Sequence, residues 1–484
     1  MIQPQGQRST ADAAAPRPGA VRSWWLRDAL SAEGEPQPAP PLSEDVDADV
    51  VIIGGGYTGM WTAWFLAERA PDARIVILEQ DICGGGPSGR NGGFVHGWWE
   101  SIGYLAHEFG DGPALASARA ADEVVDGIGS WCADHGVDAW FNKAGYLRVN
   151  GFPGREPDWG GTLAHLRRLG ADPELVPVGA AGVQLVCASP AFGDGLLMST
   201  AASVHPARLA RGMRRVLLER GVRIFEGTRA RSLRSGGRVQ VHTDGGTVFA
   251  GQAVLALNAW ASGWPGFRSR VLAWGSYMVM TEPIPDRLAE IGWTGGELLS
   301  DSRFTISYFR TTPDGRIAFG AGVGAAGYDG RIGGTFTHDA HAIDRVVSNF
   351  RHLLPMLRDV RFEASWGGPI DITGARFPEI GSTGGGRVHF AHGFAGNGAG
   401  PSRLAGRILA ELVDGRGEPT VSALPFVNRR QPVLPPEPFR FVGARLIREA
   451  LIREDDALDA GRRPGILVRA IAPLPRLLGY KLGH

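Results

Sequence analysis

The chain has few cysteines and no excess of charge of either sign. Its three cysteines, Cys83, Cys132 and Cys187, form no Cys-x-x-Cys pair, which argues against a disulfide framework and against a zinc site. The 50 basic and 50 acidic residues cancel, so no overall field attracts nucleic acid or an anionic membrane. We therefore expect a cytoplasmic protein that does not bind nucleic acid.

Long apolar runs are also missing. No stretch of about eighteen apolar residues occurs, and Met1–Val21 is polar and rich in Ala and Pro, without the apolar core of a signal peptide. Lysine is scarce too, because Lys143 and Lys481 are the only two among 50 basic residues. These absences predict no integral membrane segment, a loose N-terminal arm and few candidates for lysine-dependent chemistry.

Glycine, in contrast, is abundant, and one cluster follows a strand pattern. The run Gly54-Gly55-Gly56-Tyr57-Thr58-Gly59 lies between the apolar segment Asp49–Ile53 and the helical pattern Trp61–Ala67. In such a turn the first glycine permits the tight bend, the second lets the backbone approach a pyrophosphate, and the third lets helix and strand pack closely. The N-terminus of the helix then faces the phosphates. The predicted binding residues of this turn are Gly54, Gly56, Tyr57, Thr58 and Gly59.

An acidic residue stands where the second half of this motif requires one. The strand pattern Arg74–Leu78 ends at Glu79, twenty residues beyond Gly59. This is the distance at which a dinucleotide-binding fold places the carboxylate that binds the ribose. Strand, glycines, helix, second strand and acid in this order predict dinucleotide binding. The alternative is a structural turn, because the chain contains 71 glycines.

A second glycine cluster occurs far downstream. The strand pattern Val388–Ala391 leads into Gly393-Phe394-Ala395-Gly396-Asn397-Gly398-Ala399-Gly400, and Pro401 then opens a helix. The N-terminus of that helix would stabilise negative charge on the pyrimidine edge of a flavin ring. The predicted backbone donors are Gly396, Asn397 and Gly398.

The segment Gly86-Pro87-Ser88-Gly89-Arg90-Asn91-Gly92-Gly93 follows Glu79 and has no obvious role in a nicotinamide enzyme. With it the sequence resembles the D-amino-acid-oxidase-like superfamily of FAD-dependent amine oxidoreductases, closest to the gamma-glutamylputrescine oxidase type, in which a Ser-Gly-Arg-Asn-Gly-Gly segment follows the acidic strand. The resemblance covers about residues 45–420 and departs at Pro87, where relatives usually carry Ala. It includes His205–Leu209, Gly221–Thr228, Asn258–Trp260, Trp366–Gly368 and Pro378–Gly381.

The resemblance implies FAD as the cofactor. Glu79 would bind the adenosine ribose, and the backbone of Ala230 would contact adenine. Some relatives bind flavin covalently through a late cysteine, but no cysteine follows Cys187, so we expect non-covalent FAD. The pyrophosphate and the ring system would lie along Gly86, Ser88, Gly89, Arg90, Asn91, Gly92 and Gly93.

The fold class that follows is α/β, with a Rossmann-like FAD-binding domain and a discontinuous, mainly antiparallel-sheet substrate domain. In the N-terminal arm, Ser23–Leu26 carries tandem tryptophans that we expect to be buried against the body. The predicted segments are 1–44 for the arm, 45–105, 201–265 and 365–422 for the FAD-binding domain, 106–200 and 266–364 for the substrate domain, and 423–484 for a C-terminal extension.

The C-terminal extension has two interpretations. From residue 440 it contains nine basic and five acidic residues, so it could contact a membrane surface or a partner protein. Its prolines, among them Pro464, Pro473 and Pro475, interrupt any long helix. Packing against the parent fold is the interpretation that we favour.

Amine oxidation by flavin moves a hydride from the carbon next to nitrogen onto N5 of the ring, so the protein must orient that carbon and bind the amine neutral. His96 is the best placed proton acceptor, because histidine titrates near physiological pH. Arg310 and Arg303 suit a substrate carboxylate, although structural pairing explains them equally well. The predicted catalytic residues are His96, Trp366, Arg310 and Tyr308, each of which is also compatible with a role in the core.

The sequence indicates the cofactor more directly than the electron acceptor. Sarcosine-oxidase relatives use a lysine above the flavin to reduce oxygen, but the corresponding segment, Arg316–Gly320, contains none. Oxygen chemistry would then depend on Lys143, a histidine or an arginine. We expect oxidation of a primary or secondary, polyamine- or amino-acid-like amine to an imine or aldehyde, with O2 reduced to H2O2. The alternatives are a dehydrogenase that reduces a carrier protein or quinone, and a flavin-bearing subunit without activity of its own.

Overall fold

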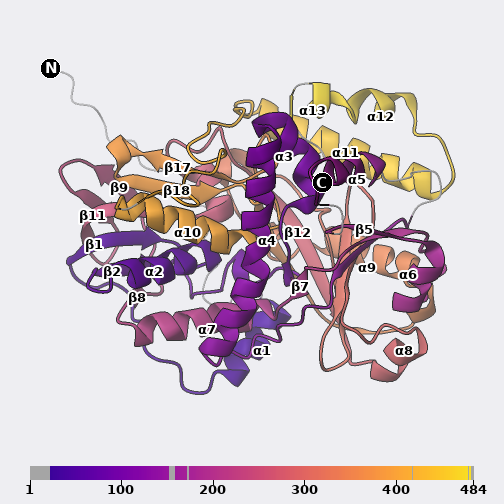
Figure 1. Ribbon diagram of the computed structural model, residues 1–484, viewed down its shortest axis with the longest axis horizontal. Coiled ribbons are helices and arrows are strands. Elements are labelled where there is room, and N and C mark those ends of the chain that lie inside the picture. The colour runs from indigo at the N-terminus through magenta and orange to yellow at the C-terminus, as the bar shows by residue number, and fades with distance from the viewer. Residues whose placement is uncertain (1–21, 152–158, 172–173, 417, 478, 481–484) are drawn as a thin grey trace.

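The computed structural model describes residues 22–151, 159–171, 174–416, 418–477 and 479–480. The predicted loose arm Met1–Val21 lies outside these residues. Two large sheets lie side by side, and helices cover their outer faces (Figure 1). The predicted α/β class is confirmed.

The first sheet has a parallel core built around β1 (Val46–Ile53). β1 pairs in parallel with β2 (Ile75–Leu78) on one side and with β11 (Thr247–Leu255) on the other. The last four residues of β1 are all buried, which explains why they form a continuous apolar run rather than an alternating pattern. The other strands of this sheet are β8 (Arg223–Phe225), β9 (Ser232–Ser235), β10 (Val239–His242), β17 (Glu379–Thr383) and β18 (Val388–His392).

Both glycine turns open at the same edge of this sheet. β11 pairs in parallel with β1 and with β18, so the carboxyl ends of all three strands lie together. Helix α2 (Tyr57–Arg69) follows β1, and α10 (Pro401–Asp414) follows β18.

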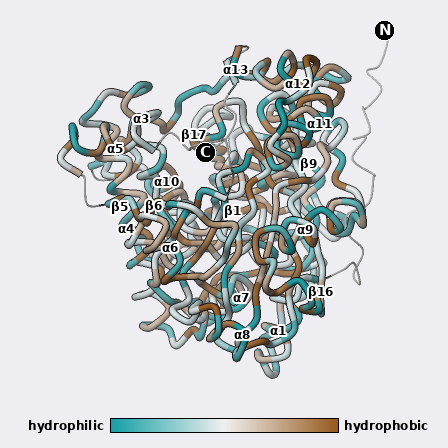
Figure 2. Tube along the Cα trace, turned by 90° about the vertical axis from the view of Figure 1, so that its right-hand side faces the viewer, coloured by the Kyte–Doolittle hydropathy of each residue, from teal (hydrophilic) through white to brown (hydrophobic). Residues whose placement is uncertain are grey.

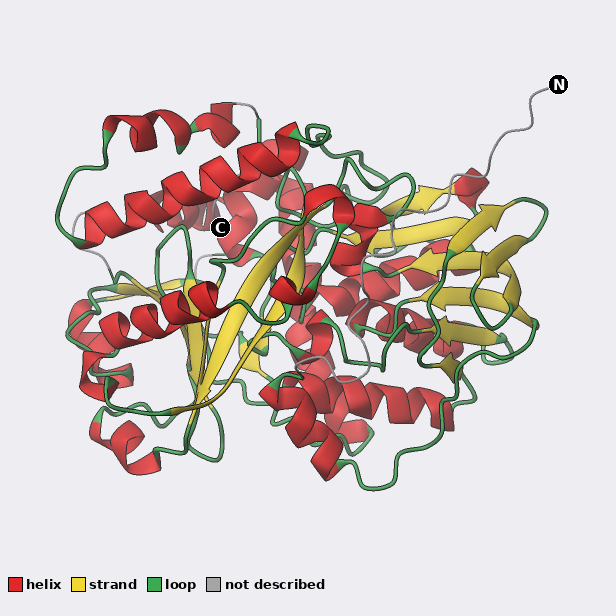
Figure 3. Cartoon of the chain, turned by 180° about the vertical axis from the view of Figure 1, so that it is seen from behind, coloured by secondary structure: helices red, strands yellow, loops and turns green. Residues whose placement is uncertain are grey.

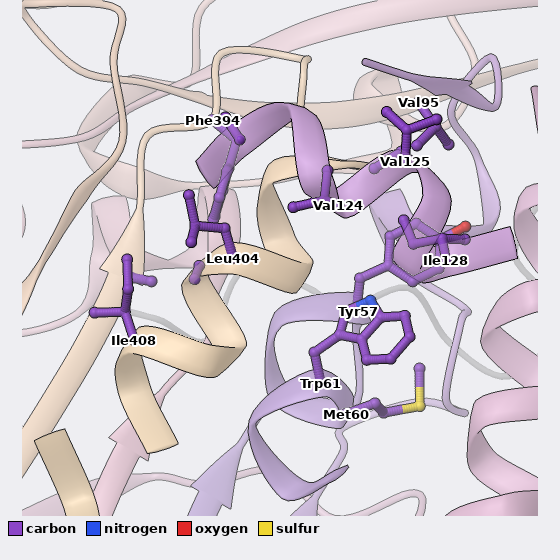
Figure 4. Packing of buried hydrophobic residues seen from close by; sticks show 14 of the residues in the cluster. Tyr57, Met60, Trp61, Val95, Val124, Val125, Ile128, Phe394, Leu404 and Ile408 are labelled. Carbon is purple, nitrogen blue, oxygen red and sulfur yellow. The ribbon is translucent and has the colours of Figure 1, made fainter. Parts of the chain in front are cut away.

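Helices α2 and α10 pack directly on one another. A Cβ at Gly406 would lie 2.5 Å from the Cβ of Trp61, so this contact requires glycine. Figure 4 shows the core around it, with side chains from α2, α10 and α4 (Asp111–Asp134). The close packing holds the starts of α2 and α10 in one position relative to each other. Two further helices of this half are α3 (Ile102–Phe109) and α7 (Pro206–Glu219).

The second sheet consists mainly of antiparallel pairs. Its order is β16-β12-β15-β14-β13-β4-β6-β5, and the long ribbon of β12 (Leu272–Thr281) and β16 (Phe362–Ile372) forms the edge nearest the first sheet. The mainly antiparallel character predicted for this sheet is confirmed. The remaining strands are β4 (Tyr146–Val149), β5 (Val176–Val178), β6 (Gly195–Met198), β13 (Leu298–Ser300), β14 (Ser307–Thr311) and β15 (Ile317–Ala321). The associated helices are α5 (Trp159–Arg168), α6 (Ala180–Val186), α8 (Pro285–Glu290) and α9 (Ala340–Leu353). A separate small ribbon joins β3 (Phe94–Val95) to β7 (Ala202–Ser203).

Two elements differ from the predicted allocation to domains. β16 pairs with β12 from Phe362 to Ile372, so residues 365–372 belong to the second sheet rather than to the first. α4 was assigned to the substrate domain, but it shares a hydrophobic cluster with α2 and α10. Both differences arise from tertiary packing that local sequence patterns do not contain. The remaining domain boundaries stay predictions.

The N-terminal anchor is buried as predicted. Trp25 and Leu26, in α1 (Trp24–Ala32), are completely buried. Trp25 lies edge-on to Trp366 of β16, and the Ser23 hydroxyl donates to the carbonyl of Gly89. The anchor therefore contacts the segment that resembles FAD-binding relatives.

The C-terminal extension forms a helical layer beside the second sheet (Figure 3). α11 (Phe439–Asp459) packs on the body, where the Asp455 carboxylate accepts from the backbone and the hydroxyl of Thr305. α12 (Ile466–Ile471) and α13 (Leu474–Leu477) lie outside α11, and the hydrophobic stretch of α12 is at the molecular surface (Figure 2). Within the described chain, no helix combines the length and the apolar character needed to cross a bilayer.

Candidate active site

One large cavity is lined by residues from both sheets and from the C-terminal extension. Its volume is about 1610 Å³, larger than the roughly 300–1,000 Å³ of most small-molecule sites. Its lining includes Glu79, which follows β2 of the first sheet, and Tyr308, which lies in β14 of the second sheet. The cavity therefore has room for a dinucleotide and for a second small molecule.

The first glycine turn, Gly54–Gly59, forms a cradle along the cavity. Its glycines are required for different structural reasons. Gly54 has φ +115°, and a Cβ there would lie 2.4 Å from the carbonyl oxygen of Ala256. A Cβ on Gly59 would lie 2.0 Å from the oxygen of Gly54, so Gly59 serves close packing and does not line the cavity. A Cβ on Gly56 would meet only the Ser88 hydroxyl, at 3.0 Å. Beyond Ser88 the space at Gly56 is open, as a pyrophosphate requires.

Glu79 lies at the carboxyl end of β2 and faces this cradle. Its two carboxylate oxygens accept from the backbone N–H groups of Gly55, at 2.8 Å, and Asp81, at 2.9 Å. Burial raises the pKa of Glu79 to about 7 despite these bonds. A carboxylate fixed in this way can accept further hydrogen bonds from ribose hydroxyls.

This pKa predicts a pH dependence of FAD binding. Ribose hydroxyls bind the ionised carboxylate, whereas near pH 6 much of the Glu79 in the free protein is protonated, so binding must release a proton. The affinity for FAD should therefore rise as the pH rises towards 7, by up to about tenfold per pH unit, and level off above it. Fluorescence titration of FAD across this range measures the effect. Glu79→Gln should bind more weakly at every pH and show a flat profile, and a slope that persists in this variant would contradict the assignment.

The segment after Glu79 is fixed by its own hydrogen bonds. The Ser88 hydroxyl accepts from the N–H of Tyr57 at 2.8 Å, and the Asn91 amide donates to the carbonyls of Pro87 and Ser88. Arg90 is buried and donates to the carbonyls of Gly85 and Gly367. Gly86, Ser88, Arg90, Asn91 and Gly92 line the cavity, whereas Gly89 and Gly93 do not and instead allow close packing against Gly84 and Val204.

A short stretch of irregular backbone, residues 228–230, lies beside Glu79. The N–H of Thr228 donates to the carbonyl of Glu79 at 2.7 Å, and Ala230 lines the cavity two residues later. This placement agrees with the predicted contact between Ala230 and adenine, which stays a prediction. Tyr57 and Thr58 also line the cavity.

The second glycine turn carries backbone strain and unpaired polar atoms. Ala395 has φ +53°, a conformation that non-glycine residues rarely adopt. The Oδ1 atoms of Asn397 and of Asp371, on the neighbouring strand β16, are buried without a hydrogen-bond partner. The Asp371 Oδ2 accepts from Gly393, and burial raises the pKa of Asp371 to about 7. The cavity-lining residues of this turn are Phe394, Ala395, Gly396, Asn397, Gly398 and Ala399.

These features fit the flavin end of FAD. Buried polar atoms normally have partners, so two orphaned acceptors beside a strained turn indicate a ligand that supplies donors. The glycine cradle and Glu79 would then hold the pyrophosphate and the ribose, which stays a prediction. The residues that could hold FAD are therefore arranged along one continuous cavity.

His96 also lines the cavity and lies next to the second glycine turn. Its Nδ1 is 3.1 Å from the carbonyl oxygen of Gly97. A carbonyl only accepts, so Nδ1 carries the proton and Nε2 keeps a free lone pair. Burial lowers the pKa of His96, which keeps the ring neutral. A Cβ at Gly400 would lie 2.9 Å from the oxygen of His96, so turn and histidine are in direct contact.

A row of aromatic side chains begins beside His96. The Tyr146 ring lies 5.2 Å from His96, and Phe94 packs edge-on against both Tyr146 and Tyr308. The Tyr308 hydroxyl is 2.9 Å from the Ser276 hydroxyl, and burial raises the pKa of Tyr308 to about 12, so it stays neutral. These rings form an apolar wall with a few polar groups, which suits a small organic substrate.

Two of the predicted catalytic residues do not line the cavity. Arg310 is buried and donates to the carbonyls of Gly92, Thr311 and Val204, while its guanidinium lies over the Trp25 ring. Trp366 is also completely buried and donates to the carbonyl of Arg90. Both side chains fix the backbone of residues 90–92 and do not face the cavity, which corrects the direct roles that we predicted for them.

Arg303 and Lys143, considered for the substrate carboxylate and for oxygen chemistry, do not line the cavity either. Arg303 is buried, and its Nε lies 3.1 Å from Oδ2 of Asp301. The two side chains form a structural ion pair. Lys143 is paired with Asp126 at the surface and does not line the cavity. Among the described residues, no lysine lines the cavity, and Lys481 lies outside them.

The structure adds residues that sequence reasoning missed. Tyr146, Glu100, Asp371 and Arg376 line the cavity, together with Ile447 and Leu451 of α11. Asp371 had a signal, because a carboxylate inside the apolar run Pro369–Ile372 is unusual. The others had none, since long-range folding alone brings them to the cavity.

Comparison with known proteins agrees with this geometry. Probable oxidoreductase OrdL of Rhizobium meliloti (strain 1021) is 30% identical over 76% of this chain and 83% of its own length. Gamma-glutamylputrescine oxidoreductase of Escherichia coli (strain K12) is 27% identical over 79% of this chain and 87% of its own. Glycine oxidase from Geobacillus kaustophilus superposes with a TM-score of 0.65 at 20% identity, over 80% of this chain and 100% of that one.

The family model described as FAD dependent oxidoreductase, DAO, matches residues 49–412. The match includes both glycine turns, Glu79 and the strands of both sheets. Because it covers more than half of the chain, the protein belongs to the DAO family of FAD-dependent oxidoreductases, and the resemblance read from the sequence is confirmed.

Proposed function

We propose that this protein oxidises a primary or secondary amine, polyamine- or amino-acid-like, to an imine that hydrolyses to a carbonyl compound. The observation that carries the proposal is His96, a neutral histidine of fixed tautomer between the second glycine turn and an aromatic wall. FAD, when bound, supplies an acceptor for the hydride of the carbon next to nitrogen. Relatives whose names include gamma-glutamylputrescine oxidoreductase and iminodiacetate oxidase support an amine as the substrate.

The residues of the cavity perform three tasks in this proposal. Nε2 of His96 accepts a proton from the ammonium form of the substrate, because only the neutral amine releases a hydride readily. Phe94, Tyr146 and Tyr308 exclude water and orient the carbon chain. The turn at Gly396–Gly398 presents backbone N–H groups to the cofactor.

We propose O2 as the electron acceptor, giving H2O2. The competing acceptor is a carrier protein or quinone, and it is favoured by the absence of lysine among the described cavity-lining residues. A flavin-bearing subunit without activity of its own is the third alternative. For localisation we propose the cytoplasm, because Cys83, Cys132 and Cys187 are all free thiols.

Anaerobic mixing separates these alternatives. The purified holoenzyme is mixed with a panel of polyamines, N-methyl amino acids and amino acids while the visible absorbance of the flavin is followed. Bleaching by one member supports amine oxidation and identifies the substrate class, whereas flavin that no amine bleaches contradicts it. Air then distinguishes an oxidase, which recovers its colour rapidly, from a dehydrogenase, which recovers only with an added dye.

We also propose that α12 and α13 contact an anionic membrane surface. Ile466, Leu467 and Leu477 are 78%, 76% and 77% exposed. Four exposed arginines accompany them, and no acidic residue follows Asp459 in the sequence. These arginines are Arg462, Arg463, Arg469 and Arg476.

Vesicle sedimentation tests this contact. The full chain should sediment with phosphatidylserine vesicles and not with purely zwitterionic ones. The double variant Leu467→Asp with Leu477→Asp should stay in the supernatant while keeping its FAD, because neither leucine lines the cavity. Equal sedimentation of wild type and variant would contradict membrane contact through these helices.

A further inference from the structure

The C-terminal helix α11 lies outside the part of the chain that the family model matches, yet it forms part of the cavity wall. The match ends at residue 412, and α11 begins at Phe439. Residues that recur every three to four positions lie on one side of a helix. Besides Phe439, the side of α11 that lines the cavity consists of Arg440, Gly443, Ala444, Ile447, Arg448 and Leu451.

Hydrogen bonds hold α11 near both of its ends. At the first end, Arg440 donates to the carboxylate of Glu437 and to the carbonyl of Arg268, which lies before β12. At the other end, the Asp455 carboxylate accepts from the backbone N–H of Thr305, at 3.1 Å, and from its hydroxyl, at 2.7 Å. The helix is therefore a fixed wall of the cavity rather than a loose tail.

The second of these contacts places α11 beside the strand that carries Tyr308. Leu451 lies one helical turn before Asp455, on the same side of α11. The segment to which Asp455 is bonded leads directly into β14, and Phe304, Ile306 and Tyr308 line the cavity together with Leu451. Tyr308 belongs to the row of aromatic side chains described above. The wall formed by α11 thus continues from that row.

The side chains of this wall are apolar apart from two arginines that are bonded to the protein itself. Arg440 makes the contacts given above, and Nε of Arg448 donates to the carbonyl of Val323 at 2.9 Å. Apolar surface in a cavity favours ligand groups that water solvates poorly. The remaining residues of the wall, none of which has a polar side chain, are Gly443, Ala444, Ile447 and Leu451.

Gly443 leaves open space beside this wall. A Cβ there would meet nothing within 4 Å, although Gly443 lines the cavity. Glycine inside a helix lowers stability relative to alanine, so helix formation does not explain it. Close packing does not explain it either, in contrast to Gly406 of α10. A larger side chain at this position would instead extend into the open space.

We propose that Gly443, Ala444, Ile447 and Leu451 form an apolar subsite, and that the substrate amine carries an extended alkyl or aryl group that lies against it. This inference rests on the proposed amine oxidation in the same cavity. The aromatic row orients the carbon next to nitrogen, and α11 binds the part of the substrate farthest from that carbon. The C-terminal extension thereby determines which amines bind well.

Primary alcohols test the subsite without turnover, because a hydroxyl replaces the amine and the flavin stays oxidised. The holoenzyme is titrated with n-propanol and n-hexanol while the flavin spectrum and the melting temperature are followed. Wild type should bind n-hexanol more tightly, by about fourfold for each added methylene group. Leu451→Asn should reduce this gain by about tenfold. Leu446→Asn is the matched control, because Leu446 is 54% exposed on α11 and does not line the cavity.

Gly443→Leu provides a second test, which does not depend on removing a packed side chain. The leucine should fill the open space and abolish the preference for n-hexanol, while n-propanol and FAD still bind. Its melting temperature should not fall, because leucine favours a helix more than glycine does. A lower melting temperature with unchanged binding of n-hexanol would overturn the proposal. Loss of FAD from this variant would also overturn it, because the wall would then belong to the cofactor.

The outcomes separate this inference from the proposed function. If an amine bleaches the flavin but wild type binds n-hexanol no more tightly than n-propanol, the apolar subsite is wrong and amine oxidation stands. If no amine bleaches the flavin but the preference for n-hexanol depends on Leu451 and Gly443, the subsite stands and amine oxidation is wrong. Equal effects of Leu451→Asn and Leu446→Asn on n-hexanol binding would exclude the subsite.

Discussion

Replacing Gly56 by leucine should give a folded protein that contains no FAD. Gly56 has φ −86°, which any residue adopts, and a Cβ there meets only the Ser88 hydroxyl, at 3.0 Å. The added side chain would therefore not disturb the turn, but it would fill the space left for the pyrophosphate. We expect the affinity for FAD to fall by more than about 100-fold, which corresponds to about 2.7 kcal/mol.

The measurement is the ratio of FAD to protein after purification, together with the melting temperature of the apoprotein. Gly112→Leu is the matched control, because Gly112 is exposed in α4 and a Cβ there meets nothing within 4 Å. It should retain full FAD content. A Gly56→Leu protein that binds FAD like wild type would contradict the assignment of Gly56 to the pyrophosphate site. An unfolded variant would show that Gly56 has the packing role of Gly59.

Replacing His96 by asparagine should slow reduction of the flavin by amine about 10²- to 10⁴-fold, the usual range for loss of a general base. FAD content should not change, because the hydrogen bond of His96 goes to its neighbour Gly97 rather than to the cofactor segment. Anaerobic stopped-flow absorbance measures the rate constant directly. His107→Asn is the control, since the His107 side chain is 83% exposed.

The pH profile distinguishes a base from a residue that only packs. Burial lowers the pKa of His96, so wild type should stay active down to a pH below the ordinary histidine value and lose activity as the ring is protonated. In His96→Asn this acidic limb should disappear. A variant that is slower but keeps the same limb would assign the titration to another group, such as the substrate amine.

The binding turns could be predicted from the sequence because their chemistry is local. Gly54, Gly56 and Glu79 follow strands whose apolar runs are unambiguous, and the spacing alone brings them together. The roles of Gly59, Gly89 and Gly93 as packing residues still needed the structure, because only the neighbouring backbone decides whether a glycine faces a ligand or a chain.

The substrate end could not be predicted in the same way. Arg310 is one of 50 basic residues, and nothing in its local sequence tells that its guanidinium donates to backbone carbonyls rather than facing a substrate. Burial and the placement of partners depend on the whole fold. The same holds for Ile447 and Leu451, which reach the cavity only because α11 packs over it.

The strand order of the first sheet has a consequence for biosynthesis. β1 and its partner β2 are complete early in translation, but the other partner, β11, ends at Leu255, and β18, which pairs with β11, ends at His392. Until then the nascent chain has an unpaired, apolar strand edge, which is prone to aggregate. Premature stop codons before β18 should therefore produce insoluble fragments rather than smaller cofactor-binding proteins.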